Sequence, residues 1–228
     1  ANDCLIQVII LKMRNNNFNT PPVVTNLLII NVLFFLATEF LPEGAVNFMY
    51  QKFALFFWKS DFFMPHQIVT YMFMHGSLMH LFSNMFAVWM FGRILEYNLG
   101  SRRFLIYYLI CGIGAGLIQL GVNWIDFVNA GTAAETFRAA NASTIGASGA
   151  VFGILLAFGM LYPNSQIVLL FPPIPLKAKY FVIIYGVFEL FAGISGRMDG
   201  IAHFAHLGGM LWGFLLLYYW KKKGKIFY

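Results

Sequence analysis

Long apolar stretches alternate with short polar or basic segments along most of the chain. A stretch of about 20 apolar residues is long enough to cross the hydrocarbon core of a bilayer as a helix. Apolar stretches cover residues 23–41, 68–97, 104–125, 145–162, 180–195 and 201–220. The pattern therefore predicts an all-α membrane protein, a bundle of six transmembrane helices with both chain ends on one side of the membrane.

The segment after the first predicted span has a different composition. Residues 45–68 are rich in aromatic side chains but also contain Lys52, Lys59, Asp61 and Pro65. Aromatic and charged side chains together favour the membrane interface over the hydrocarbon core. We therefore predict a long interfacial loop after the first helix.

The overall composition agrees with a membrane protein. Hydrophobic residues make up 60% of the chain and charged residues 11%, whereas about 25% of an ordinary soluble domain is charged. So little charge does not cover a surface that faces water. The simplest organisation is one membrane domain at residues 23–220, preceded by a cytoplasmic segment at 1–22 and followed by a basic cytoplasmic tail at 221–228.

The formal net charge of +6 indicates topology rather than affinity for nucleic acid. Cytoplasmic segments of membrane proteins concentrate Lys and Arg. With six spans, the side that holds both chain ends carries most of them: Lys12, Arg14, Arg93, Arg102, Arg103, Lys177, Lys179, Lys221, Lys222, Lys223 and Lys225. Both ends are therefore predicted to be cytoplasmic, with the lipid bilayer as the surroundings and no nucleic acid as a partner.

The three even-numbered spans carry unusual polar residues near the ends predicted to face outward. Gly146, Ala147, Ser148 and Gly149 open the fourth span, which places Ser148 about one helical turn below the outer surface. The alternative is that these small residues only let helices pack closely, as is common in membrane proteins.

His206 lies in the last span at a depth that matches Ser148. An ionisable side chain at membrane depth is costly and points to function. Gly209 and Gly213 follow His206 at one and two turns, and Gly149 follows Ser148, so small residues would let the two helices approach closely. Close approach permits a hydrogen bond through which an imidazole takes the serine proton. The alternative is that both polar residues only tie helices together.

His80 and Asn84 are four residues apart in the second span, so they share one helical face. Acyl transfer needs hydrogen-bond donors aimed where negative charge develops on the carbonyl oxygen. His80, Asn84 and the backbone N–H of Ser148 are candidates for that role. The alternative is an interhelical clamp made from two polar side chains.

The remaining polar residues of the spans have simpler interpretations. His75 and His203 are interpreted as structural, and Arg93 and Glu96 as an ordinary ion pair near the cytoplasmic surface. Glu189 lies inside the fifth span, and neither its partner nor its role is evident from the sequence.

Taken together, four motifs strongly resemble the rhomboid protease family. They are HGSLMHxxxN at 75–84, FGRxLE at 91–96, GASGAxFG at 146–153 and AHLGGxxxG at 205–213. The resemblance covers residues 68–220, and the motif order and the six-helix count match. The resemblance implies that Ser148 is the nucleophile, that His206 is the general base and later the acid, and that His80 and Asn84 stabilise the oxyanion.

The resemblance also implies details of the surroundings of His206. Phe152 stands where some members have a tyrosine that stacks on the catalytic histidine, so stacking is expected without the hydroxyl. His206 is expected to work without a third carboxylate, since Asp199 is the one acidic residue that the sequence suggests near it. The six-helix form resembles prokaryotic members, which implies a bacterial inner membrane.

The function implied is that of an intramembrane serine endopeptidase without a cofactor or metal. Its substrates would be membrane proteins with a transmembrane helix, cleaved near the outer face; the sequence does not give the oligomeric state. One alternative is a related binding protein that captures membrane helices without cutting them. Another is a metal-dependent membrane protein that uses His75, His80, His203 and His206, although no His-Glu-x-x-His motif is present.

Overall fold

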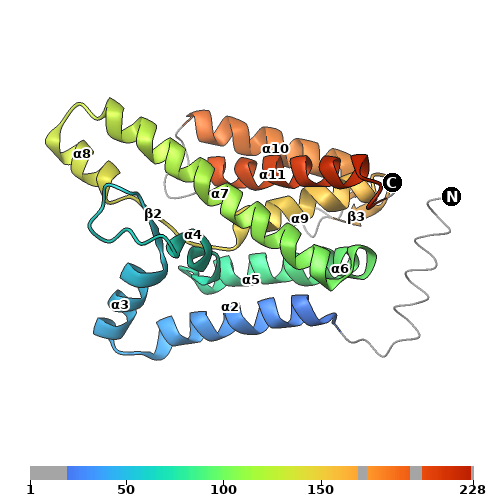
Figure 1. The fold of residues 1–228 in the computed structure, drawn as a ribbon, viewed down its shortest axis with the longest axis horizontal. Coiled ribbons are helices and arrows are strands. Elements are labelled where there is room, and N and C mark those ends of the chain that lie inside the picture. Colours follow the sequence, from blue (N-terminus) through green and yellow to red (C-terminus); the bar gives the residue numbers. More distant parts are fainter. Residues whose placement is uncertain (1–19, 169–173, 196–201, 227–228) are drawn as a thin grey trace.

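The computed structural model describes residues 20–168, 174–195 and 202–226, and these residues are mostly helical (Figure 1). Within these ranges, four helices are long and apolar enough to cross a membrane: Pro22–Phe40, Leu78–Leu99, Ser101–Asn129 and Ala178–Ser195. A shorter apolar helix covers Ser148–Leu161. The chain therefore has the helical architecture of a membrane protein.

The helical elements follow one another with short connections. They are α2 (Pro22–Phe40), α3 (Glu43–Phe53), α4 (Gln67–Thr70), η1 (Tyr71–Phe73), α5 (Leu78–Ala87), η2 (Val88–Gly92), α6 (Arg93–Leu99), α7 (Ser101–Asn129), α8 (Ala133–Ala140), α9 (Ser148–Leu161), α10 (Ala178–Ser195) and α11 (His203–Lys222). The segment η2 is a π-helix that joins α5 to α6.

Two small antiparallel sheets accompany the helices and were not predicted from the sequence. β1 (Leu55–Phe56) pairs with β2 (Ser143–Thr144), and β3 (Gln166–Val168) pairs with β4 (Pro175–Lys177). The first sheet joins the segment after α3 to the segment just before α9. It therefore ties two parts of the chain that are far apart in sequence at the entrance to α9.

The long helices run alternately in opposite directions along the long axis of the molecule (Figure 1). α11 packs mainly against α7 and α9, and α7 also packs against α9. These three helices form the centre of the bundle. α10 covers α9 and α11 from one side, and α2 packs against α5 and η2.

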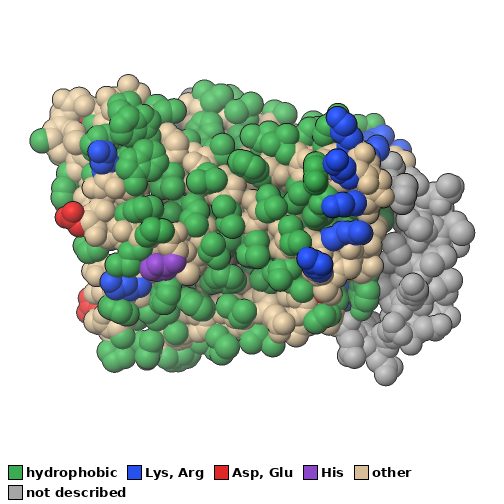
Figure 2. All heavy atoms as spheres, in the orientation of Figure 1, with side chains coloured by type: hydrophobic (Ala, Val, Ile, Leu, Met, Phe, Trp, Pro, Cys, Tyr) green, Lys and Arg blue, Asp and Glu red, His purple; other side chains and the backbone are tan. Residues whose placement is uncertain are grey.

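The outer surface of the bundle is strongly apolar, as a lipid-facing surface requires. On α10, Ile183, Val187, Phe191 and Ile194 are each at least 60% exposed, which is unusual for a protein that faces water. Figure 2 shows hydrophobic side chains over the middle of the molecule and Lys and Arg gathered toward the end where α7 begins and α11 ends. This distribution agrees with a membrane-embedded middle and a basic end.

The second and fourth predicted spans differ in how well hydropathy locates the start of the helix. In the second predicted span, 68–97, the long helix begins at Leu78, where the unbroken apolar part of that span starts. Ser77 is in extended conformation, and its hydroxyl accepts a hydrogen bond from the backbone N–H of His80. The fourth begins at Ser148 rather than 145, because Gly146 adopts a φ of 120° that no helix contains. The predicted start of the last span, residue 201, lies outside the described residues.

The predicted interfacial loop and the polar segment between the third and fourth predicted spans both contain helices. Residues 45–68 include most of α3, and residues 126–143 include α8. α8 begins with a capping box, in which the Thr132 hydroxyl accepts from the N–H of Glu135 and the Glu135 carboxylate accepts from the N–H of Thr132. Hydrogen bonds from Gly131 and Thr132 hold the pKa of the Glu135 carboxyl below its usual range. Because α3 takes up the first part of residues 45–68, the interfacial loop expected there is shorter and more ordered than predicted.

The interpretation of Arg93 and Glu96 as an ordinary ion pair is wrong. Glu96 is buried, and its carboxylate accepts hydrogen bonds from the backbone N–H groups of Val23 at 3.0 Å and Val24 at 2.8 Å, and from the Ser101 hydroxyl at 2.6 Å. Arg93 instead lies over the ring of Trp89, 4.6 Å from its centroid. Glu96 thus caps the N-terminus of α2, whose own N-cap residue is a proline without a capping side chain.

Replacing Glu96 with glutamine is expected to lower the free energy of unfolding in detergent by about 1–3 kcal/mol, because one buried backbone N–H of α2 loses its acceptor. The amide also removes the negative charge that the N-terminus of a helix favours. Glu39→Gln, at the exposed opposite end of α2, is the matched control and is expected to change stability by less than about 0.5 kcal/mol. Equal stability of the two variants would contradict the capping role.

Candidate functional site

Ser148 is the first residue of α9 and follows a tight turn at Gly146. The N–H of Gly146 donates to the carbonyl oxygen of Tyr71 at 2.9 Å. A Cβ at Gly146 would lie 2.7 Å from Nε2 of His80, so both the positive φ and the space require glycine. The turn holds Ser148 partly buried at the N-terminus of an apolar helix.

His206 lies in the first turn of α11, and its side chain is directed at Ser148. His206 Nε2 lies 2.8 Å from Ser148 Oγ, which is a hydrogen bond between residues that are 58 positions apart. His206 is buried, with 9% of its surface exposed. The structure therefore brings together the serine and the histidine that the sequence pattern singled out, at the distance that proton transfer between them requires.

Phe152 follows Ser148 by one turn on α9 and lies flat against the imidazole. The Phe152 and His206 ring centroids are 4.2 Å apart, with an angle of 6° between the ring planes. Tyr185 of α10 contacts the Phe152 ring at 5.3 Å between centroids. The imidazole of His206 is therefore fixed on one face by an apolar ring that offers no hydroxyl.

Glycines allow α9 and α11 to approach each other closely. A Cβ at Gly209 would lie 1.8 Å from the carbonyl oxygen of Gly149, so the two backbones are in direct contact. Gly213 does not face α9 as expected: a Cβ there would meet the Tyr107 hydroxyl of α7 at 2.3 Å. The glycines of α11 thus serve two interfaces. Gly209 lies at the contact between α11 and α9, and Gly213 lies at the contact between α11 and α7.

His80 and Asn84 lie on α5, and His80 lies next to the turn at Gly146. His80 Nε2 is beside Gly146, and the ring of the buried His75 contacts the His80 ring edge-on at 4.9 Å between centroids. The Asn84 side-chain amide donates to the carbonyl oxygen of His80 at 2.9 Å. His80 therefore lies beside the turn that leads into Ser148, and one amide N–H of Asn84 already has an acceptor on its own helix.

The expectation that Asp199 is the one acidic residue near His206 is wrong. Glu189 of α10 is buried, and its Oε2 accepts a hydrogen bond from Nδ1 of His206 at 2.9 Å. The same oxygen accepts from Nδ1 of His203 at 2.6 Å. Asp199 lies outside the described residues. The partners of Glu189, which the sequence left open, are thus the two histidines of α11.

A signal for this cluster was present in the sequence. Glu189 is a carboxylate inside an apolar stretch, and His203 and His206 are three residues apart, so they lie on one helical face of the next helix. A buried carboxylate needs hydrogen-bond donors. Joining the two observations required the knowledge that α10 packs against α11.

Two of the four histidines named in the metal-dependent alternative share one carboxylate. His75 and His80 contact each other, whereas His203 and His206 contact Glu189. The potential ligand atoms of Glu189, His203 and His206 all lie within 4.8 Å of one another. In this arrangement each Nδ1 already donates to the Glu189 carboxylate.

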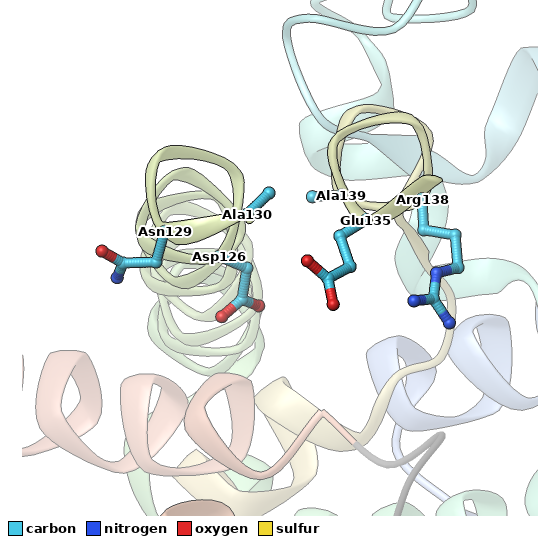
Figure 3. A pocket seen from close by; sticks show the side chains of 6 residues that line it. All are labelled: Asp126, Asn129, Ala130, Glu135, Arg138 and Ala139. Atoms are coloured by element: carbon cyan, nitrogen blue, oxygen red, sulfur yellow. The ribbon is translucent and has the colours of Figure 1, made fainter. Parts of the chain in front are cut away.

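A separate, open depression of about 430 Å³ lies between α7 and α8 (Figure 3). The Asp126 and Glu135 carboxylates point into it, and Arg138 lies farther along α8. Ser148 and His206 are not among its lining residues. Asp126 and Glu135 are therefore separate from the hydrogen-bonded group of Ser148, His206 and Glu189.

Comparisons with known proteins agree with the motif pattern. The family model described as a rhomboid domain matches residues 63–223. The chain is 32% identical over 155 residues to "Rhomboid protein 1, mitochondrial" of Saccharomyces cerevisiae, an alignment that covers 68% of this chain and 42% of that protein. It is 29% identical over 207 residues to "Rhomboid-like protein 11, chloroplastic" of Arabidopsis thaliana, with 84% and 63% covered.

A third relative is "Presenilin-associated rhomboid-like protein, mitochondrial" of Bos taurus, which is 28% identical over 156 residues. That alignment covers 66% of this chain and 38% of the relative. The chain thus spans between about two fifths and two thirds of the length of these three relatives. Each alignment includes most of this chain and a smaller share of the relative.

Proposed function

Because the chain belongs to the rhomboid family, we propose that it is an intramembrane serine endopeptidase with Ser148 as nucleophile and His206 as general base. The observation that carries this proposal is the 2.8 Å hydrogen bond between Ser148 Oγ and His206 Nε2. A serine hydroxyl is a weak nucleophile until a neighbouring base takes its proton. The burial of His206 and the partial burial of Ser148 at the start of an apolar helix support a reaction inside the membrane.

In the proposed reaction, Ser148 Oγ attacks the carbonyl carbon of the scissile peptide bond while His206 Nε2 accepts the hydroxyl proton. His206 then gives this proton to the leaving amine, which breaks the C–N bond and leaves an acyl-enzyme. A water molecule then attacks the acyl carbon while His206 takes its proton. The ester bond to Ser148 breaks, and His206 returns the proton to Ser148 Oγ. The imidazole must keep its orientation through both halves, and the stacked Phe152 ring supports that.

The developing oxyanion is proposed to be stabilised by the backbone N–H of Ser148 together with His80 and Asn84. The N-terminus of α9 supports this assignment, because the first N–H groups of a helix have no intrahelical acceptors and carry partial positive charge. His80 lies beside the turn before Ser148. Asn84 retains one amide N–H beyond the one that it donates to the His80 carbonyl oxygen.

The proposed topology has six crossings, formed by α2, α5 to α6, α7, α9, α10 and α11, within one domain at residues 23–220. Their alternating directions support it (Figure 1). The basic ends of α7 and α11 would then face the cytoplasm, and Ser148 would lie toward the outer face. A bacterial inner membrane is proposed, although the relatives named above are mitochondrial and chloroplastic.

The substrates are proposed to be membrane proteins with a transmembrane helix that unwinds readily near the outer face. Attack by Ser148 requires an extended peptide, because a helical segment hides its carbonyl groups in intrahelical hydrogen bonds. This proposal includes neither a metal nor a cofactor.

The test combines a covalent probe with a cleavage assay on purified protein in liposomes. A fluorophosphonate is expected to label Ser148, as read by mass spectrometry of peptides, and a single-span model substrate is expected to be cut at one site. Both signals are expected to persist in a strong chelator. Capture of the substrate without cleavage would instead indicate a binding protein, and loss of activity in chelator would indicate a metal-dependent enzyme; either result would overturn the proposal.

A further inference from the structure

We infer that Glu189 is a positioning residue that fixes the catalytically competent tautomer of His206, with His203 holding the carboxylate in place. This inference rests on the proposed serine protease function. It adds a third group to the expected pair of Ser148 and His206, and it assigns a role to two buried polar residues of the α10–α11 interface.

The geometry forms a continuous chain of hydrogen bonds. Ser148 Oγ contacts His206 Nε2 at 2.8 Å, and His206 Nδ1 contacts Glu189 Oε2 at 2.9 Å. The three side chains come from α9, α11 and α10, so three helices must pack correctly to assemble the chain. Glu189 is 4% exposed, which leaves little water to compete for its oxygen atoms.

The carboxylate determines which imidazole nitrogen carries the proton. An ionised carboxylate only accepts hydrogen bonds, so the Nδ1 atom of His206 must be protonated to contact Glu189. In a neutral imidazole, Nε2 then carries the lone pair. That lone pair points at Ser148 Oγ, where the base must act. In the other tautomer Nε2 would carry a proton and could not accept the one from Ser148.

Glu189 also stabilises the state that forms during attack. When His206 takes the Ser148 proton it becomes a buried cation, and a buried cation without a partner is costly. A carboxylate at 2.9 Å supplies the opposite charge where the effective dielectric constant is lower than in water. The contribution is larger in the transition state than in the resting enzyme, so it increases kcat more than it affects substrate binding.

His203 holds the carboxylate of Glu189 in place. Its Nδ1 donates to the same Oε2 atom at 2.6 Å, and it lies one turn before His206 on the same face of α11. A carboxylate fixed by two donors from one helix has few other positions available. His203 therefore acts on His206 through Glu189.

The rival interpretation is that Glu189 only ties α10 to α11. A purely structural tie predicts that Glu189 variants lose stability and activity together, with no change in the tautomer of His206. The positioning role predicts a defect in kcat at unchanged KM, and a changed tautomer, in protein that remains folded. These readouts separate the two interpretations.

The experiment compares Glu189→Gln with the wild-type protein in liposomes. The glutamine side chain is similar in size, but its amide can donate to Nδ1 and favour the wrong tautomer. We expect kcat to fall by about 100-fold or more, with KM changed by less than about twofold, and ¹⁵N NMR of labelled histidines to show proton transfer from Nδ1 to Nε2 of His206. Glu189→Asp, which keeps the charge, is expected to retain at least about tenfold more activity than Glu189→Gln.

The matched control is Asp126→Asn, which removes an acidic group from α7 outside the hydrogen-bonded chain and is expected to leave kcat unchanged. Full activity of Glu189→Gln alongside an inactive Ser148→Ala would overturn the inference and leave the protease proposal intact. An unchanged His206 tautomer, or a stoichiometric metal ion lost in Glu189→Gln, would also overturn it. Activity in Ser148→Ala would instead refute the proposed function.

Discussion

Ser148→Ala and His206→Ala are each expected to lower the cleavage rate by at least about 1,000-fold, and the double variant is expected to be no slower than the worse single variant. The physical reason is that the serine and the histidine act as one unit. Without the base, the hydroxyl of Ser148 stays protonated, and without the nucleophile, the base has no proton to accept. The measurement is the rate of substrate cleavage in liposomes for the four proteins.

Ser143→Ala is the matched control, because Ser143 lies exposed in β2 five residues before Ser148. It is expected to cleave at the wild-type rate. If the losses of the two single variants multiplied in the double variant, Ser148 and His206 would act independently, and the hydrogen bond between them would have no part in the chemistry.

Gly209→Val is expected to destabilise the protein by at least about 3 kcal/mol and to abolish labelling of Ser148. A Cβ at this position would lie 1.8 Å from the carbonyl oxygen of Gly149, so α9 and α11 would have to separate. A separation of even one ångström would stretch the hydrogen bond from Ser148 to His206 beyond a useful length. Stability is measured by unfolding in detergent, and site assembly by fluorophosphonate labelling.

Gly121→Val provides the comparison for this effect. Gly121 also lies within a long helix, α7, but a Cβ there meets nothing within 4 Å. Valine is a better helix former than glycine, so this variant is expected to be at least as stable as wild type and fully labelled. Similar behaviour of the two valine variants would show that the close approach at Gly209 is not required.

The helices and the polar residues within them were predictable because apolar spans make polar side chains conspicuous. Ser148 and His206 stood out at matching depths of two even-numbered spans, beside glycines that permit close packing. The structure brings these two residues into hydrogen-bond contact. Hydropathy gives the order of helices along the chain, and the small residues indicate which faces can meet.

Hydrogen-bond partners could not be predicted from the sequence where the partner lies on a different helix. Glu96 and Arg93 have the spacing of an intrahelical ion pair, yet the carboxylate of Glu96 contacts the N–H groups of α2 instead. Unsatisfied N–H groups at a buried helix end compete strongly for such a carboxylate. Glu189 was noticed, but its partners depend on how α10 is rotated against α11, which hydropathy does not determine.

The starts of α8 and α9 were predicted wrongly because they depend on local capping and turn geometry. The Thr132 and Glu135 capping box was readable as a helix start, but the polar composition of residues 126–143 favoured a loop. Near Ser148, the apolar Ile145 extended the predicted span backwards, whereas the positive φ of Gly146 makes the helix begin later, at Ser148. Local turn chemistry decided both boundaries.

The 14-residue length of α9 determines the physical surroundings of the proposed reaction. A helix of this length rises about 21 Å, whereas the hydrocarbon core of a bilayer is about 30 Å thick. α9 is buried among α7, α10 and α11, so neighbouring helices rather than lipid surround it. In the proposed topology, the remaining depth above Ser148 can therefore form a water-filled well enclosed by protein. The short length of α9 thus sets how far the water consumed in hydrolysis must descend, and the neighbouring helices line its path.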